Sequence, residues 1–158
     1  MTDSTTPALT ALASAGIPHT VTRHGRVNSL EEAAAARGIE PRDLIKTLVV
    51  RRGEGDYLFV LVPGDREISW PKLRAHLGVS RLSMPPADEA KDATGYERGT
   101  ITPFGSTTEW PVIADETLLE PGRMISLGAG AHGVAVTVAA ADVISSTHAT
   151  SADVTEPS

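Results

Sequence analysis

Two long apolar segments in the middle of the chain constrain its fold more than any other feature. Residues 46–52 (KTLVVRR) and 56–62 (DYLFVLV) are separated only by Gly53-Glu54-Gly55. A short glycine-containing connection between β-prone segments predicts a β-hairpin. Because the two segments are almost continuously apolar, we expect their strands to lie in the middle of a sheet that is covered on both faces.

Helix and strand signals alternate through the rest of the chain. Ser29 and Glu32 have the spacing of a capping box before the helix-prone LEEAAAAR, which ends at Gly38. A second capping serine, Ser69, predicts a helix through Leu77. Further helices are predicted at residues 8–15, 86–93 and 139–144, and further strands at 19–23, 80–84, 112–114, 124–127 and 134–138. The pattern predicts an α/β fold with a mixed central sheet of about six to seven strands and flanking short helices.

The length of 158 residues indicates a single domain. Residues 1–6 are small and polar, and we expect them to be flexible. Residues 145–158 contain only one large aliphatic side chain, Val154, which cannot offset the entropy lost on ordering, so we expect a disordered tail. The predicted domain is therefore residues 7–144.

Composition excludes several classes of protein. The chain has no cysteine, which excludes disulfides, iron–sulfur clusters, thiolate zinc sites and cysteine nucleophiles. Its histidines lack the spacing of a zinc helix, so we expect neither a metal nor a cofactor. No apolar run reaches the ~18–20 residues of a membrane span, and the N-terminus does not resemble a secretory signal. We therefore expect a cytoplasmic protein without a membrane partner.

The formal net charge of −6 argues against binding nucleic acid through bulk charge. An acidic net charge is still compatible with a local basic patch. The candidates for such a patch are Lys46, Arg23, Arg26 and Arg98.

The glycine-rich segment 128–133 (GAGAHG) matches the letters of a dinucleotide-binding fingerprint. That fingerprint requires a helix directly after the glycines, whereas the β-branched VAVTV follows here. We reject that interpretation. A glycine hairpin between two strands is the simpler interpretation, and a loop whose backbone amides approach a ligand is the alternative.

Two further features are candidates for chemistry. Lys46 lies at the start of a buried strand, where it either extends its ammonium group to water or points it into a cleft that binds an anion. Residues 95–105 (GYERGTITPFG) contain three glycines and a proline, which build a defined loop. Long loops of this kind are either functional or plain connections.

These features occur in an order that resembles the YbaK-like family, the free-standing relatives of the editing domain of bacterial prolyl-tRNA synthetase. The matching segments are AGIPHTVTRH at 15–24, EEAAAARGIEPRDLIKTLVV at 31–50, TGYERGTITPFG at 94–105, DETL at 115–118 and the strand and glycine loop at 125–133. The resemblance covers roughly residues 7–144. It implies a mixed α/β fold and a hydrolase, a trans-acting aminoacyl-tRNA deacylase that cleaves the ester between a wrong amino acid and the 3′-terminal adenosine of tRNA.

The resemblance also implies a site. Lys46 inherits the role of the family's functional lysine, which holds the phosphate or ribose region and stabilises developing negative charge. Backbone amides of the two glycine motifs would surround the amino acid and position a water molecule. The implied substrate-binding residues are His24, Ser29, Thr47, Gly99, Thr100, Pro103, Gly105, Gly128, Gly130 and His132. The implied partners are the acceptor end of tRNA and, as a further candidate, an aminoacyl-tRNA synthetase.

The chain departs from the family pattern in its last loop, where Gly128 replaces a serine and His132 replaces an arginine. Two other functions stay open: a catalytically silent module that binds aminoacyl-tRNA or a synthetase, and a hydrolase of another small ester. A hydrolysis assay distinguishes the silent module, because such a module binds without turnover.

Overall fold

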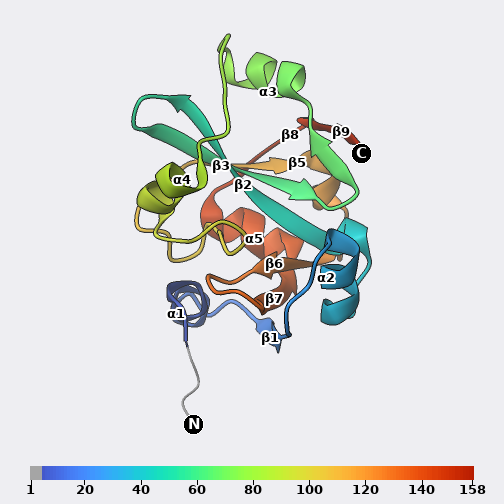
Figure 1. The fold of residues 1–158 in the computed structure, drawn as a ribbon. Coiled ribbons are helices and arrows are strands. Elements are labelled where there is room, and N and C mark those ends of the chain that lie inside the picture. Colours follow the sequence, from blue (N-terminus) through green and yellow to red (C-terminus); the bar gives the residue numbers. More distant parts are fainter. Residues whose placement is uncertain (1–4) are drawn as a thin grey trace.

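A seven-stranded mixed sheet forms the centre of the molecule (Figure 1). A computed structural model describes residues 5–158. The strand order is β1-β7-β6-β2-β3-β5-β8, with antiparallel β1–β7, β7–β6 and β2–β3 pairs and parallel β6–β2, β3–β5 and β5–β8 pairs. The strands are β1 (His19–Arg23), β2 (Leu44–Gly53), β3 (Asp56–Pro63), β5 (Val112–Asp115), β6 (Met124–Gly128), β7 (Val134–Ala139) and β8 (Thr150–Ala152). This architecture confirms the predicted α/β fold and the size of the sheet.

The predicted hairpin is β2 and β3, the central antiparallel pair. Successive side chains of a strand point to opposite faces of the sheet. Phe59 and Leu61 accordingly pack in one apolar core, whereas Leu58 and Val60 pack in a second core on the other face. Both faces are covered, which explains why this part of the sequence is apolar without alternation.

Short helices cover the sheet. They are α1 (Pro7–Ser14), α2 (Leu30–Arg37), α3 (Trp70–Leu77), α4 (Ala87–Thr94) and α5 (Ala140–Thr147), with 3₁₀ turns at Pro41–Asp43 and Glu116–Leu119. Helices α1, α4 and α5 contribute to the first core, and α3 contributes to the second. The predicted capping of α2 is confirmed: Ser29 Oγ accepts a bond from Glu32 N (3.1 Å), and Glu32 Oε2 accepts one from Asn28 N (3.0 Å).

The prediction of a disordered tail at residues 145–158 is wrong. Helix α5 continues to Thr147, β8 pairs with β5, and β9 (Thr155–Pro157) pairs with β4 (Arg66–Ile68). Val154 is fully buried. The composition argument considered only apolar side chains, whereas this segment is ordered by backbone bonds to two strand edges and by buried polar contacts described below.

Two smaller predictions also need correction. Residues 80–84 form no strand; they make only an isolated bridge between Ser83 and Arg51. The expected flexible segment 1–6 lies mostly outside the described residues, but Thr6 is buried and ordered. Its Oγ1 accepts a bond from Leu9 N (3.1 Å), which caps α1, and donates to the carbonyl of Ala129 (2.6 Å).

Candidate functional site

A cavity of about 530 Å³ lies beside β2, where β6 separates from it. The two strands are paired only at Leu44↔Ser126 and Ile45↔Leu127, so the next residues of β2 have no strand on that side. The walls come from β2, the segment leading into α4, and the loop after α4. The lining residues are Arg37, residues 44–49, residues 84–87, Ala90, Arg98, Gly99, Ile101 and Gly128.

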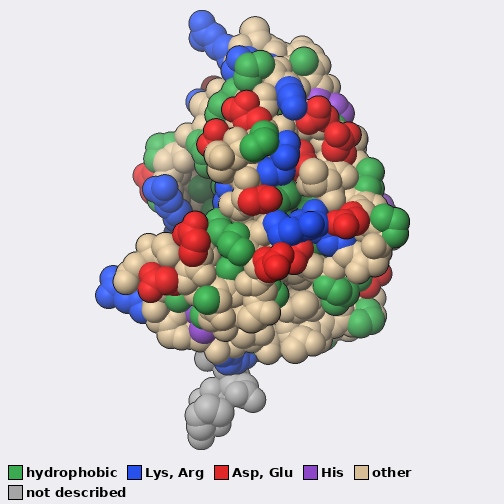
Figure 2. Space-filling view, turned by 90° about the vertical axis from the view of Figure 1, so that its right-hand side faces the viewer, with side chains coloured by type: hydrophobic (Ala, Val, Ile, Leu, Met, Phe, Trp, Pro, Cys, Tyr) green, Lys and Arg blue, Asp and Glu red, His purple; other side chains and the backbone are tan. Residues whose placement is uncertain are grey.

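The charged residues that line the cavity are all cations: Arg37, Lys46 and Arg98. The chain as a whole is acidic, and the face in Figure 2 shows positive and negative side chains interspersed rather than one basic surface. The positive charge is therefore local. A half-enclosed apolar cavity with three cations suits an anionic ligand, because its low dielectric strengthens each charge interaction.

Lys46 is one of the lining residues of this cavity, and it is partly buried. Its Nζ donates to the backbone carbonyl of Arg66 (2.6 Å). Burial lowers the pKa of Lys46, and the carboxylates of Glu67 and Asp65 oppose that shift. The ammonium is thus anchored by a neutral carbonyl, and this bond uses one of its three N–H donors.

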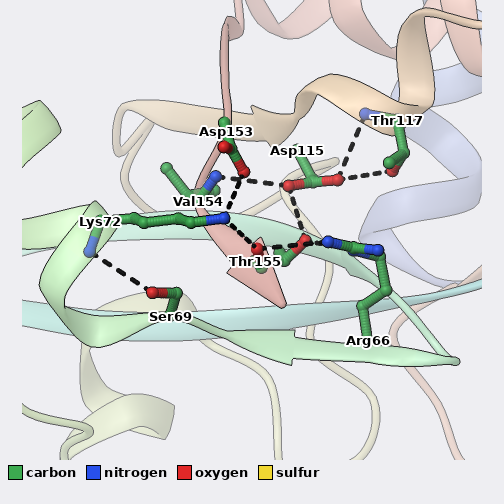
Figure 3. A network of polar contacts seen from close by, with 8 residues as sticks. All are labelled: Arg66, Ser69, Lys72, Asp115, Thr117, Asp153, Val154 and Thr155. Carbon is green, nitrogen blue, oxygen red and sulfur yellow. Dashed lines mark hydrogen bonds and ion pairs between the residues drawn. The ribbon is translucent and has the colours of Figure 1, made fainter. Parts of the chain in front are cut away.

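A buried polar network fixes the strand that carries this carbonyl (Figure 3). Arg66 Nε donates to Thr155 Oγ1 (2.6 Å), and that hydroxyl donates to Asp115 Oδ1 (2.8 Å). Asp115 is 1% exposed. Lys72 Nζ bonds to the carbonyl of Thr155 (3.1 Å). The C-terminal strand β9 therefore supports β4, and β4 supports Lys46.

Two polar groups of the cavity lining have no bonding partner among the described residues: the buried Thr47 Oγ1 and Arg37 Nε. Arg37 is held by one bond from Nη1 to Ser126 Oγ (3.3 Å), and burial lowers its pKa. Buried polar atoms without partners are costly, so both groups are candidates for contact with a ligand.

The loop after α4 has a defined structure built around Tyr96. The Tyr96 hydroxyl donates to the carbonyl of Phe104 (2.6 Å). The carbonyl of Thr100 accepts a bond from Gly130 N (3.0 Å), which joins this loop to the glycine loop after β6. The loop places Gly99 and Ile101 in the cavity wall.

Burial raises the pKa of Tyr96 to about 12, which makes the fold sensitive to high pH. The unfolded chain loses this proton near pH 10 and the folded chain only near pH 12, so stability falls as the pH rises through that window. Tyr96→Phe has no group that titrates at this position. We therefore expect the unfolding free energy of wild type, relative to that of Tyr96→Phe, to fall by about 2 kcal/mol between pH 9 and pH 11.5.

Urea unfolding of both proteins at both pH values measures this change. A difference in unfolding free energy that is the same at the two pH values would contradict the raised pKa of Tyr96.

The structure brings together some of the expected site residues. Lys46, Thr47, Gly99 and Gly128 all line the cavity. Thr100 is buried directly behind it. The interpretation of residues 128–133 as a hairpin connection is confirmed, since β6 and β7 are antiparallel neighbours.

Other expected site residues lie outside the lining. Gly105 and Gly130 have positive φ angles and pack against Tyr96, where a Cβ atom would lie 2.7 Å from the hydroxyl oxygen and from a ring carbon, respectively. Ser29 caps α2. The remaining three residues are also not among the lining residues. Pro103 is half-buried in its loop, and His24 N bonds to the carbonyl of Gly133. His132 is exposed; its Nε2 lies 3.3 Å from Glu97 Oε2, and its ring lies near Gly99 at the edge of the cavity.

Sequence reasoning missed Arg37 and the wall at residues 84–87. In the sequence, Arg37 is only the last residue of a helix, and its place beside β2 depends on how α2 packs. The described residues contain no cluster of three or more potential metal-binding side chains and no helix long and apolar enough to cross a membrane.

Comparison with known proteins gives a consistent result. Residues 24–145 match the model of the aminoacyl-tRNA editing domain. The proline–tRNA ligase of Bacillus licheniformis is 34% identical over 89 residues, which are 56% of this chain but only 15% of the ligase. An Enterococcus faecalis protein named "Putative Cys-tRNA(Pro)/Cys-tRNA(Cys) deacylase EbsC" is 28% identical over 127 residues, 80% of this chain and 77% of that protein.

A solved structure described as "a putative trans-editing enzyme for prolyl tRNA synthetase" superposes with a TM-score of 0.83 at 25% identity, and covers 95% of both chains. The family match extends over most of the chain, from the residue after β1 into α5. The chain therefore belongs to the aminoacyl-tRNA editing domain family, the YbaK-like proteins related to the editing domain of prolyl-tRNA synthetase.

Proposed function

We propose that this protein is a trans-editing deacylase that hydrolyses the ester between a mischarged amino acid and the 3′-terminal adenosine of tRNA. The observation that carries the proposal is the cavity beside β2, whose charged lining residues are all cations and include Lys46. Its volume of about 530 Å³ lies within the ~300–1,000 Å³ typical of small-ligand sites. Because the substrate is aminoacyl-tRNA, we propose that the protein acts in the cytoplasm.

The lining suggests how the ester is cleaved. It contains no serine, cysteine or histidine that would serve as a nucleophile or base. A water oxygen attacks the ester carbonyl carbon, the bond to the ribose oxygen breaks, and that oxygen takes up a proton. We assign Lys46 to stabilising the negative charge that develops, with the free Thr47 hydroxyl and the backbone at Gly99 and Gly128 positioning the substrate. The substrate's own vicinal hydroxyl is the candidate for relaying the proton.

The walls suggest the class of amino acid. Met84, Pro85 and Ile101 supply apolar surface. Such surface favours small, weakly polar side chains such as those of alanine or cysteine. It distinguishes one methylene group by only about 1–3 kcal/mol, so overlapping substrates are expected.

Single-turnover hydrolysis of mischarged tRNAs tests the proposal. The panel contains Ala-, Cys- and Ser-tRNA on proline, threonine and lysine acceptors, with tRNA binding measured in parallel. We expect release of at least one amino acid well above the spontaneous rate. Binding without release across the panel would contradict the deacylase and support a silent binding module. Equal hydrolysis of a minimal aminoacyl ester and the full tRNA would indicate a small-ester hydrolase.

A further inference from the structure

A second hollow, of about 400 Å³, lies near the far end of β2. We call it the arginine hollow. Half of its lining residues are arginines: Arg51, Arg52, Arg74 and Arg81, accompanied by Gly53, Ser80, Leu82 and Ser83. The sequence segments that carry the family resemblance do not include these residues.

The arginine hollow carries more positive charge than the nearby acidic groups neutralise. Arg51 pairs with Glu89 (3.3 Å) and Arg52 with Asp56 (3.0 Å). Arg74 and Arg81 form no ion pair with any other residue in the range 5–158, and no carboxylate lines the hollow. Like charges held together in a concave site repel one another, and an anion relieves that repulsion.

The chemistry of the lining favours phosphate. Guanidinium groups donate hydrogen bonds in a planar fork that matches phosphate oxygens. The two serine hydroxyls, of Ser80 and Ser83, are additional donors of the kind that contacts backbone phosphates. Four arginines around one hollow suit a chain of phosphates better than a single carboxylate.

The arginine hollow follows the cavity along β2 and along the segment before α4. Val49 lines the cavity, and Arg51, two residues farther along β2, lines the hollow. On the other wall, Ser83 belongs to the hollow and Met84 to the cavity. Hydrogen bonds from Arg51 N to Ser83 O (2.7 Å) and from Ser83 N to Arg51 O (3.1 Å) tie the two walls together. From Lys46 to Arg51 the strand extends roughly 17 Å, which is the length of several nucleotides.

We propose that the arginine hollow binds backbone phosphates of the tRNA acceptor strand, while the terminal adenosine and its amino acid occupy the cavity. This rests on the function proposed above. It explains how an acidic protein selects tRNA: a short track of cations along β2 replaces an extended basic surface. Arg74 and Arg81 provide the free charges, and the paired arginines hold the walls.

The test is the double variant Arg74→Gln/Arg81→Gln, assayed with two substrates. Full mischarged tRNA reaches both the hollow and the cavity, whereas an aminoacyl-adenosine reaches only the cavity. We expect the KM for tRNA to rise about tenfold and the salt dependence of tRNA binding to weaken by about 1.4 in slope, the value for two lost phosphate contacts on a single strand. Hydrolysis of the aminoacyl-adenosine is expected to stay unchanged.

Two matched variants make the result specific. Arg42→Gln removes one arginine charge at an exposed position just before β2 begins, at the end of the strand that is far from the arginine hollow. It should leave tRNA binding unchanged. Arg74→Lys/Arg81→Lys keeps the charges and should restore most of the salt slope. Thermal unfolding confirms that each variant is folded.

The outcomes separate this proposal from the proposed function. Unchanged tRNA binding and KM in the folded glutamine double variant would overturn the arginine hollow while leaving the deacylase intact. Equal losses of hydrolytic activity in this variant on mischarged tRNA and on aminoacyl-adenosine would also overturn the proposal for the arginine hollow. If wild type hydrolysed nothing, binding of deacylated tRNA would still test the arginine hollow, because its salt dependence needs no turnover.

Discussion

Replacing Lys46 with alanine is expected to lower the single-turnover rate of aminoacyl-ester hydrolysis by about 10²–10³-fold, the usual effect of removing one group that stabilises a developing oxyanion. Lys46, Arg37 and Arg98 are the charged residues of the cavity lining, and the Lys46 ammonium is anchored by the carbonyl of Arg66. The substitution removes one of these three positive charges and leaves those of Arg37 and Arg98. Rapid-quench measurement of amino acid release gives the rate.

Stability measurements distinguish a chemical role of Lys46 from a structural one. Lys46→Met keeps the aliphatic chain. The loss of the hydrogen bond to Arg66 destabilises the fold, whereas the loss of a partly desolvated charge stabilises it, so the two effects oppose each other. We expect its unfolding free energy to change by no more than about 1 kcal/mol. Lys46→Arg keeps the charge in a larger, planar group and should retain only part of the activity. Hydrolysis by Lys46→Met at the wild-type rate would contradict the role assigned to the ammonium.

Replacing Asp115 with alanine is expected to destabilise the protein by about 3–4 kcal/mol, because a buried carboxylate that accepts four hydrogen bonds is lost and buried donors are left unpaired. Asp115 Oδ1 accepts from Thr155 Oγ1 (2.8 Å) and Val154 N (3.4 Å). Asp115 Oδ2 accepts from Thr117 N (3.2 Å) and Oγ1 (2.5 Å). At 2–4 °C per kcal/mol for a domain of this size, Tm should fall by roughly 10 °C.

Asp153→Ala is the matched control, because it removes an exposed carboxylate from the C-terminal segment that Asp115 contacts. Asp153 pairs with Lys72 at the surface (3.0 Å), and its side chain is 51% exposed. An exposed pair of this kind contributes about 0–1 kcal/mol, so Tm should change little. Differential scanning calorimetry compares the two variants, and equal losses of Tm would refute the special role of the buried carboxylate.

The parts of the fold that follow from local sequence rules agree with the structure. The Ser29 and Ser69 caps start helices where predicted, because a cap depends only on residues within one turn. The β2–β3 hairpin was predictable, because two apolar segments joined by a short glycine connection have few alternatives. Lys46 was a candidate because lysine is uncommon at the start of a buried strand.

The rest of the site depends on contacts between distant segments. Arg37 reaches the cavity through a bond to Ser126, 89 residues away in sequence. The local pattern at residues 80–84 predicted a strand, but the structure has only an isolated bridge there, in which backbone bonds join Ser83 to Arg51. The resemblance placed His24 and Ser29 at the site, but His24 N bonds to the glycine loop at Gly133 and Ser29 caps a helix.

The α/β class, the central hairpin, the helix starts and the candidate lysine can be predicted from the amino-acid sequence, because each is encoded by neighbouring residues or by an uninterrupted apolar pattern. The ordering of the C-terminal segment, the cationic lining of the cavity and the arginine hollow depend instead on contacts between distant segments. Val154 is buried because β4 and β5 offer free edges and Asp115 offers acceptors, and those partners lie about 40 to 90 residues away. Composition cannot register such partners, since a polar segment becomes ordered when another part of the chain satisfies its backbone and hydroxyl groups.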